Sequence, residues 1–279
     1  MDPKQFQKII RKHYRKNKKK NNFPWRRTKN PYHILVSEIM LQQTQIPRVI
    51  PKYNEWIKTF PTIQALAKAP FSKVMSIWHG LGYNRRARYL KDAAEKIIKL
   101  HKNKIPRDPN MLETLPGIGR YTARAVSCFA YGICEPFLDT NIRRVYIHFF
   151  GGKKEKITDE TLLMFIQKTA PIRNKDKWYG ALMDYGRDIV GDKKDNPNRK
   201  SKTYSKQSPF LGSRRYIRAK IITYLLNHKT GTTTQIKHAL KKDIHAQHYL
   251  ADRKFLSLIS SLQHEGMLSQ SSKRLSIRR

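Results

Sequence analysis

Cysteine and long apolar stretches are what this sequence most lacks. Its 279 residues include two cysteines, Cys128 and Cys134. Two are too few for a disulfide framework or for a metal site with four cysteine ligands, and we expect a reducing intracellular compartment. No stretch approaches the roughly 20 apolar residues that span a bilayer. Residues 1–14 are amphipathic and basic without an apolar core, so we expect neither a secretory signal nor a membrane partner.

Acidic residues are also scarce. The chain has 20 acidic residues against 58 lysines and arginines, which gives a formal net charge of +38 at pH 7. Such an excess favours a partner that carries phosphates, because binding releases counterions and weakens steeply as the salt concentration rises. The charge therefore indicates a nucleic acid as the partner without indicating an activity. With 39% hydrophobic residues the chain can still form a packed core, as one large domain or two to three small ones.

Amphipathic segments of helical length dominate the sequence, whereas strand patterns are sparse. We therefore expect a mainly α fold. Thr158 and Asp159 are typical of the start of a helix. The helices expected on this basis lie at residues 1–15, 33–45, 63–68, 72–78, 86–100, 141–150 and 158–169.

The last third of the chain follows a different pattern. Residues 184–213 are poor in apolar groups and rich in Lys, Asn and Ser, which is typical of a linker or a mobile loop. Helical segments follow at residues 214–227, from the threonines at 232–234 to Lys241, and at 252–265, before Gly266. Residues 267–277 can fold back as a hairpin. Three helices followed by a hairpin predict a winged-helix-like domain.

A glycine-rich turn, LPGIGRYT, occupies residues 115–122 between two expected helices. Glycines allow a tight turn that exposes successive N–H groups at a helix N-terminus, which is a site for an anion. Ile118, between Gly117 and Gly119, is expected to point into the core and fix the hairpin. Two glycines around one apolar residue are equally compatible with an ordinary tight turn.

Two carboxyl groups are candidates for catalysis. Glu38 shares a helical face with Ile34, Leu35 and Leu41, and desolvation on such a face raises the pKa of a carboxyl group. The alternative is a surface glutamate on an amphipathic helix. Asp139 can cap the helix that follows it, or it can serve as an anion. Together they would provide the acid and the anion that cleavage of a glycosidic bond needs.

Five segments in this order and spacing resemble those of MutY-type adenine DNA glycosylases in the helix-hairpin-helix (endonuclease III) superfamily. The resemblance covers about residues 6–190 and rests on residues 23–27, 37–45, 80–83, 115–122 and 138–141. It implies the glycosylase fold, with two helical subdomains around a central cleft. The domains expected are residues 1–30 with 138–195, a six-helix subdomain with the hairpin at 31–137, a linker at 196–213 and the winged-helix-like domain at 214–279.

The resemblance also implies catalytic roles. Glu38 would protonate adenine, and Asp139 would stabilise or briefly bond the sugar cation, oriented by Asn141. Tyr121 would lie against the same sugar. The residues expected around the flipped base are Trp25 and Arg26, although ordinary packing is the alternative for Trp25.

Further residues are expected to contact DNA. Gln43 and Tyr83, with Leu81, would enter the duplex beside the opposing purine; the alternatives are a solvated Gln43 and ordinary packing of Tyr83. The hairpin would hold a DNA phosphate, in some relatives with a monovalent cation on its carbonyl oxygens. The complete expected set is Gln42, Gln43, Thr44, Leu81, Tyr83, Leu115, Gly117, Ile118, Gly119 and Arg120.

Tyr121 distinguishes two kinds of glycosylase. Endonuclease III-type enzymes have a lysine at this position, whose amine forms a Schiff base and leads to strand cleavage. A tyrosine cannot form a Schiff base. The resemblance therefore implies a monofunctional glycosylase that leaves an abasic site.

The sequence departs from the family in three places. Relatives have four cysteines that hold an iron–sulfur cluster, but residues 190–197 contain none, so we expect no cofactor. Gly180 stands where relatives have Gln or Glu near the base. The roughly 70 residues after the linker are too few for a Nudix-like domain. They would add DNA affinity or serve for packing; the basic candidates are Arg214, Arg215, Arg218 and Lys220.

The leading hypothesis is a monomeric glycosylase that removes adenine opposite guanine or 8-oxoguanine in double-stranded DNA. A cytoplasmic, nucleoid-associated location is expected if the source is bacterial or archaeal. Thymine excision from T:G mismatches is the second hypothesis, although the related thymine enzymes carry arginines where Gln42 and Gln43 stand. A non-catalytic DNA-binding protein is the third, and the pair Glu38 and Asp139 argues against it.

Overall fold

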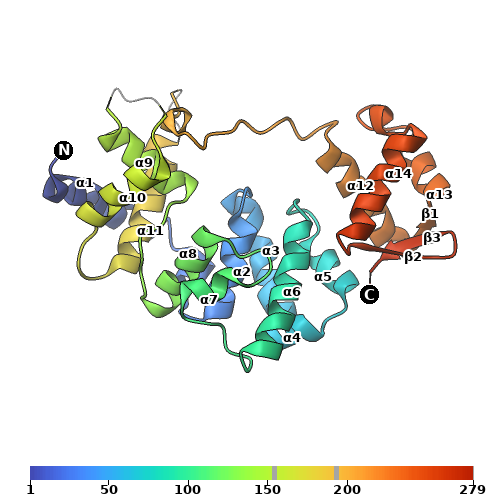
Figure 1. Ribbon diagram of the computed structural model, residues 1–279, viewed down its shortest axis with the longest axis horizontal. Coiled ribbons are helices and arrows are strands. Elements are labelled where there is room, and N and C mark those ends of the chain that lie inside the picture. Colours follow the sequence, from blue (N-terminus) through green and yellow to red (C-terminus); the bar gives the residue numbers. More distant parts are fainter. Residues whose placement is uncertain (153–155, 192–194, 279) are drawn as a thin grey trace. The chain divides into compact units, whose positions relative to one another are not determined.

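The computed structural model describes residues 1–152, 156–191 and 195–278, and the fold is mainly helical (Figure 1). The chain forms two compact units, Met1–Glu38 with Ile105–Lys206 and Ile39–Lys104 with Gln207–Arg279. Over the described ranges, no helix combines the length and the apolar character that crossing a membrane requires.

The described residues of the first unit form helices joined by turns and loops, with an isolated β-bridge between Ile157 and Ser201. Helix α2 begins in this unit and continues past Glu38 into the second. The elements are α1 (Pro3–Asn17), η1 (Pro24–Arg27), α2 (Pro31–Leu41), α7 (Pro109–Glu113), α8 (Arg120–Tyr131), α9 (Thr140–Phe150), α10 (Asp159–Thr169), α11 (Lys175–Tyr185), η2 (Gly186–Val190) and η3 (Pro197–Lys200).

The second unit combines helices with a small antiparallel sheet of strand order β1-β3-β2, in which Thr230 pairs with Ser276 and Leu268 with Ile277. The expected three C-terminal helices and hairpin are confirmed, and β1 adds a third strand. The elements are α3 (Ile46–Thr59), α4 (Ile63–Lys68), α5 (Phe71–Trp78), α6 (Arg85–Leu100), α12 (Arg214–His228), β1 (Thr230–Thr232), α13 (Thr233–Leu240), η4 (Gln247–Tyr249), α14 (Asp252–His264), β2 (Leu268–Ser271) and β3 (Arg274–Ile277).

Local sequence signals explain where many helices begin. The side chain of Thr158 accepts a hydrogen bond from the backbone N–H of Thr161 at the start of α10, as expected. Thr232 and Gln235 form a reciprocal capping box at the start of α13. Two α-helices were not expected, α3 and α11. Helix α3 contains Pro51, which interrupts the helical pattern in the sequence.

The prediction of a linker or mobile loop at residues 184–213 is wrong for residues 184–190. Residues 184 and 185 complete α11, the π-helical turn η2 follows, and the side chain of Asp184 is fully buried. Asn198 in η3 is also buried and donates a hydrogen bond to the carbonyl of Thr140 at 3.1 Å. Residues 204–209 form neither helix nor strand. The polar composition of this region reflects buried polar contacts as well as a linker.

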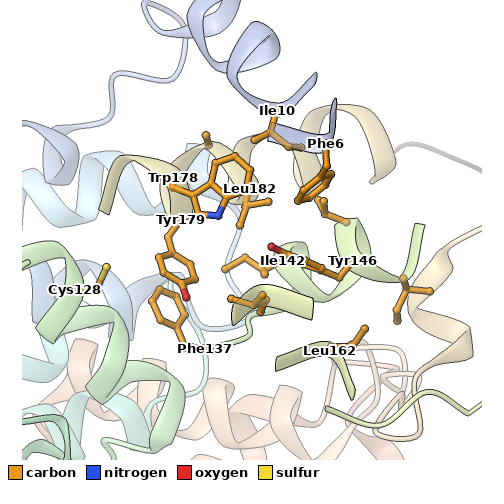
Figure 2. Packing of buried hydrophobic residues seen from close by; sticks show 14 of the residues in the cluster. Phe6, Ile10, Cys128, Phe137, Ile142, Tyr146, Leu162, Trp178, Tyr179 and Leu182 are labelled. Carbon is orange, nitrogen blue, oxygen red and sulfur yellow. The ribbon is translucent and has the colours of Figure 1, made fainter. Parts of the chain in front are cut away.

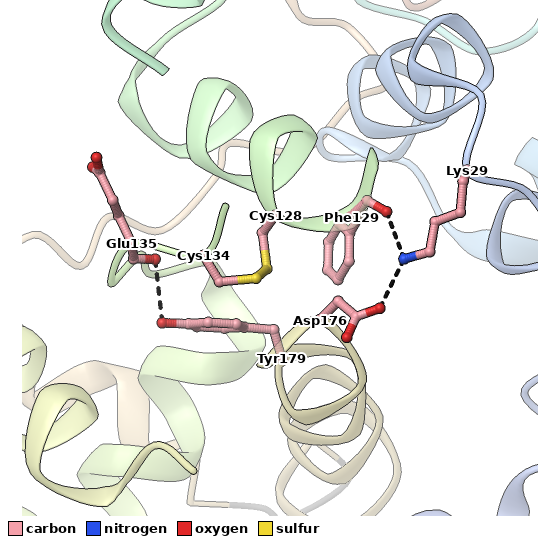
Figure 3. Close-up of a disulfide and its surroundings, with 7 residues drawn as sticks. All are labelled: Lys29, Cys128, Phe129, Cys134, Glu135, Asp176 and Tyr179. Atoms are coloured by element: carbon pink, nitrogen blue, oxygen red, sulfur yellow. Dashed lines mark hydrogen bonds and ion pairs between the residues drawn. A yellow bond between two sulfur atoms is a disulfide. The ribbon is translucent and has the colours of Figure 1, made fainter. Parts of the chain in front are cut away.

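The two units do not follow the expected domain boundaries. Residues 105–137, with the hairpin, group with residues 1–38 and not with 39–104. One reason is that Lys29 binds both the carbonyl of Phe129 in α8 and the carboxylate of Asp176 in α11, at 2.8 and 2.7 Å (Figure 3). The expected boundaries stay a prediction.

An aromatic cluster forms the centre of the first unit's core (Figure 2). Phe6 of α1 is fully buried, and its ring meets the rings of Tyr146 and Trp178 edge to face, with centroids 5.4 and 5.7 Å apart. These contacts join α1 to α9 and α11. Since α9 begins directly after Asp139, the cluster fixes the helix that carries this candidate residue.

The segment between α8 and Asp139 is held from several sides (Figure 3). Cys128 and Cys134 form a disulfide, which the expected reducing compartment does not favour. Tyr179 donates a hydrogen bond to the carbonyl of Glu135 at 3.3 Å, and its ring stacks on Phe137 at 4.0 Å between centroids. The backbone that leads into Asp139 is therefore well anchored.

We expect the substitution Cys134→Ser to lower the free energy of unfolding by about 2 kcal/mol, because the disulfide closes a short loop in the unfolded chain. Urea unfolding measured with and without a thiol reductant checks this. Reductant should destabilise the wild-type protein to the same extent and leave Cys134→Ser unchanged. A wild-type midpoint that does not respond to reductant would contradict the disulfide in solution.

Candidate active site

Glu38 lies on α2, a helix that is buried on nearly every side. Its residue surface is 6% exposed, and the hydroxyl of Tyr121 donates a hydrogen bond to its Oε2 at 2.6 Å. Burial raises the pKa of Glu38 to about 7, although the Tyr121 hydrogen bond opposes the shift. The interpretation as a surface glutamate is wrong. At neutral pH this carboxyl group is protonated in a large fraction of molecules.

Asp139 serves as the N-cap of α9. Its Oδ1 accepts a hydrogen bond from the backbone N–H of Ile142 at 2.6 Å, and its Oδ2 accepts one from the Asn141 side chain at 3.1 Å. Burial raises the pKa of Asp139, and these two hydrogen bonds oppose the shift by stabilising the charged form. The capping interpretation is confirmed, and it leaves open a further role. Asn141 has the geometry expected of a residue that orients Asp139.

Glu38, Asp139 and Tyr121 form one cluster within the first unit. The charge of Asp139 raises the pKa of Glu38. Burial is the main reason that the pKa of the Tyr121 hydroxyl is raised, and the charges of both carboxylates raise it further. Each group therefore lies close enough to affect the ionisation of the others. Because Tyr121 stays protonated, its hydroxyl can donate to Glu38 Oε2 when Glu38 is ionised. The cluster offers one acid near neutral pH and one carboxylate anchored by a helix N-terminus.

Arg26 lies near this cluster, and its charge lowers the pKa of Glu38. Its guanidinium binds both oxygens of Asp184, at 2.7 and 2.8 Å, and donates to the carbonyl of Gly180 at 3.3 Å. A Cβ atom at Gly180 would lie 3.4 Å from Arg26 Nη1. This is an ordinary van der Waals contact, so the guanidinium does not by itself require a glycine at this position. Trp25, the other residue expected around the base, is mostly buried and its ring stacks on Phe23.

The hairpin has the expected form. Gly117 has a φ of +71°, and Gly119 is the N-cap of α8. Ile118 is buried, as expected, and its N–H bonds to the carbonyl of Leu115 at 3.2 Å. Nothing lies within 4 Å of a Cβ placed on Gly119, so the backbone there is open to a bulky group. Arg120 follows on the exposed side. An open helix N-terminus beside a basic residue suits a phosphate.

Two loop residues of the second unit have unusual backbone conformations. Gln43 has a φ of 57° and Tyr83 a φ of 48°, a region that non-glycine residues seldom occupy. Tyr83 is 37% exposed, and Gln43 is exposed as well. Leu81 is 2% exposed, so its side chain does not lie at the surface with Tyr83. The hydroxyl of Thr44 donates to the carbonyl of Leu81 at 3.3 Å, which joins the two loops.

Arg86 is the residue that the sequence analysis missed. Its Nη1 donates to the carbonyls of Ile39 and Met40 at 2.8 and 3.0 Å, and its Nη2 donates to Thr44 Oγ1 and to the carbonyl of Gly82 at 3.0 and 3.1 Å. Burial lowers the pKa of Arg86 to about 10, so it stays charged at neutral pH. One buried cation thus holds both loops.

A sequence signal for Arg86 does exist. It lies four residues before Leu90, on the buried stripe of α6 that continues through Ala94 and Ile97. A cation on an apolar stripe next to a glycine-rich loop indicates a buried role. The neighbouring arginines at 85 and 88 conceal this signal, because the run resembles an exposed basic helix start.

The C-terminal segment contacts both loop residues. Gln207 donates a hydrogen bond to the side-chain oxygen of Gln43 at 2.7 Å. Arg215 donates to the hydroxyl of Tyr83, and its guanidinium lies 5.4 Å from the centre of the Tyr83 ring. Arg215 was expected to add DNA affinity; its guanidinium contacts a loop of its own unit, and the expected DNA contact stays a prediction.

The two cysteines of the sequence are joined in the disulfide, so they do not offer the thiolates that an iron–sulfur cluster needs. Among the described residues, no three His, Cys, Asp or Glu side chains gather as metal ligands. Of the cysteine-free segment, Asp192–Lys194 lie outside the described residues. Backbone hydrogen bonds hold the following turn, from Ile157 to the carbonyl of Lys200 at 2.7 Å and from Lys202 to that of Ile157 at 2.9 Å. The absence of a cofactor stays a prediction.

Comparison with known proteins shows similarity to DNA glycosylases of base excision repair. Residues 36–168 match the family model of the HhH-GPD superfamily base excision DNA repair proteins. The chain is 41% identical over 169 residues to an adenine DNA glycosylase of Mycolicibacterium smegmatis, a match that covers 60% of this chain and 58% of the relative. It is 40% identical over 135 residues to the human adenine DNA glycosylase, covering 45% of this chain and 25% of that one. The chain thus spans about half or less of the length of such relatives.

Solved structures agree on the fold. A thermostable thymine-DNA glycosylase is similar with a TM-score of 0.63 and 29% identity, over 71% of this chain and 91% of that one. An endonuclease III in a trapped covalent intermediate with DNA matches with a TM-score of 0.54 at 20% identity, over 67% of this chain and 87% of that one, which supports the fold alone. Over residues 36–168 the chain is therefore similar in sequence to the HhH-GPD superfamily of base excision DNA repair proteins, and its fold resembles that of these solved structures.

Proposed function

We propose that the protein is a monofunctional DNA glycosylase that removes adenine mispaired with guanine or 8-oxoguanine. The observation that carries the proposal is the pairing of Glu38, with a pKa of about 7, with Asp139 next to it. Curated relatives of 40–44% identity are adenine DNA glycosylases, which supports the same activity. The substrate is double-stranded DNA, and we propose that the protein acts on it as a monomer.

In the proposed reaction, protonated Glu38 donates its proton to a ring nitrogen of adenine, which is extruded from the duplex. The bond between the sugar C1′ and the base then breaks, and its electron pair leaves with the base. The Asp139 carboxylate stabilises the positive charge on the sugar. Water adds to C1′ and loses a proton to one of the carboxylates, which leaves an abasic site.

The acid favours adenine over thymine. Adenine has ring nitrogens with free lone pairs, and their protonation makes the base a better leaving group. The ring nitrogens of thymine are amide-like and offer no such lone pair. Thymine excision from T:G mismatches stays a second candidate, because the thymine-DNA glycosylase structure is similar over 91% of its length.

Tyr121 supports the absence of strand cleavage. Its phenol cannot form a Schiff base, and its hydroxyl donates a hydrogen bond to Glu38. Gln43 and Tyr83 are proposed to enter the duplex beside the opposing purine. Their strained backbone and the buried Arg86 beneath them would keep the two loop tips rigid when the stacked bases resist, at a cost of a few kcal/mol for unstacking.

The proposed function predicts which mispairs are processed. Duplexes with A:8-oxoguanine, A:G, T:G and U:G are incubated with purified protein, and abasic sites are cleaved with alkali. We expect cleavage of the two adenine substrates and none without alkali. Cleavage of T:G alone would overturn the adenine assignment, prompt scission without alkali would overturn the monofunctional one, and no cleavage at all would favour a non-catalytic DNA-binding protein.

Glu38→Gln should lower the single-turnover excision rate by at least about 100-fold, because general acid catalysis contributes that much or more. Binding of the mismatched duplex should stay within about threefold. Since burial opposes ionisation of Glu38, the neutral glutamine should also raise the free energy of unfolding at pH 8, by up to about 3 kcal/mol for a pKa shift from 4.5 to about 7. Lost stability at pH 8 together with lost binding would mean that Glu38 is structural.

The excision rate should depend on pH in two directions. It should fall above about pH 7 as Glu38 loses its proton, and it should fall in acid as Asp139 gains one. Tyr121→Phe removes a hydrogen bond that lowers the pKa of Glu38, so the alkaline limb should move to higher pH. Single-turnover rates from pH 5 to 9 test this, and an alkaline limb that stays in place or moves down would refute the assignment of Glu38.

A further inference from the structure

The C-terminal helices carry a strong excess of positive charge that is not neutralised internally. Residues 214–279 contain fourteen lysines and arginines and three acidic residues. Each acid is already paired, Glu265 with Arg85 and Arg218, Asp243 with Lys220, and Asp252 with Lys237. Most of the basic side chains therefore remain to create a positive field.

Helix α14 has two contrasting faces. Its inner face is buried against the domain core through Phe255, Leu258, Ile259 and Leu262. Its outer face is exposed at Arg253, Leu256, Ser257, Ser260 and His264, which recur at helical spacing. The two serines are small, so they allow the helix backbone to approach another surface closely. Leu256, 52% exposed, is the single apolar residue of this face.

The β2–β3 hairpin extends the same kind of surface. Its turn and adjoining residues, Gln270–Arg274 in sequence, are exposed, and Ser272 at the turn has a φ of 53°. Residues 241–251, which include η4, connect α13 to α14, and the hairpin follows α14 (Figure 1). A helix with a polar, narrow outer face fits the major groove of B-DNA, where small polar and apolar side chains meet base edges.

We propose that the outer face of α14 and the β2–β3 turn form a second binding surface for double-stranded DNA, distinct from the site at Glu38. The excess of positive charge favours DNA over a protein as the partner of this surface. A protein partner would need a larger apolar patch than Leu256 alone, whereas phosphates complement a surface flanked by Arg253, Lys254 and Lys273. This surface requires no excision chemistry.

The surface is firmly joined to the helix that follows Tyr83. Glu265, directly after α14, binds Arg85 of α6 at 2.5 Å as well as Arg218 of α12, and these arginines hold its pKa at about 2. Arg88 of α6 donates to the carbonyl of Gly266 at 3.4 Å. Binding of one duplex by α14 would therefore raise the effective concentration of that duplex at the Tyr83 loop.

Charge reversal on α14 tests the proposal. Arg253→Glu with Lys254→Glu places acids in the first turn of a helix, where the helix dipole favours them. The matched control is Lys99→Glu near the end of α6 with Lys104→Glu four residues after that helix, an equal change in charge. The length of α6 alone is about 24 Å. Binding of an undamaged 30-base-pair duplex is followed by fluorescence anisotropy from 50 to 200 mM salt.

We expect the α14 variant to lose at least about tenfold in affinity and about two units in the slope of log K against log salt, because each phosphate contact contributes about 0.9. The control should stay within about twofold. Equal losses in both variants, or none in the α14 variant, would overturn the proposal. Because the duplex is undamaged, the result is independent of whether the protein excises adenine.

A photo-crosslinker placed on a single new thiol gives a second measurement. Both native cysteines are in the disulfide, so Ser260→Cys and the control Lys99→Cys each introduce one reactive thiol. Crosslinking of duplex DNA from position 260 and not from 99 is expected. Crosslinking from neither position, or equally from both, would argue against DNA at this face even if charge reversal weakened binding.

Discussion

The burial of one carboxyl group on α2 is the constraint on which the candidate site depends. The Tyr121 hydroxyl donates a hydrogen bond to Glu38, and the neighbouring Asp139 is also acidic. In the folded protein the pKa of Glu38 lies above its ordinary value of 4.5, so ionisation of Glu38 lowers the free energy of unfolding. The protein has its full stability in acid and loses part of it as the pH rises through about 7. The fold therefore maintains an unfavourable group, as expected where stability and activity compete.

The anchoring around Asp139 serves the same arrangement. The disulfide, the Tyr179 contacts and the aromatic cluster around Phe6 all hold the backbone on one side or the other of this residue. Phe137 also contacts the ring of Tyr121 edge to face at 5.9 Å. A few aromatic side chains thus contact both the segment that leads to Asp139 and the tyrosine that binds Glu38, and they restrict the positions of both carboxyl groups.

Much of this arrangement could be predicted from local patterns. The apolar residues around Glu38 predict its burial, and the LPGIGRYT turn predicts a hairpin with Ile118 inside. Pairing between distant residues could not be predicted. The sequence shows the charge of Arg215, Arg218 and Lys220 but does not show that each has a partner within its own unit. The disulfide and the contact of Arg26 with Asp184 are hidden for the same reason.

Arg86 has a consequence for how the second unit can move. Its guanidinium binds the backbone of the Gln43 loop and that of the Tyr83 loop simultaneously, so neither loop can shift without breaking bonds to a buried charge. The tips of the Gln43 and Tyr83 loops are therefore expected to move together. A deletion or insertion in either loop would therefore alter the conformation of the other, and the lengths of the two loops would have to change together in evolution.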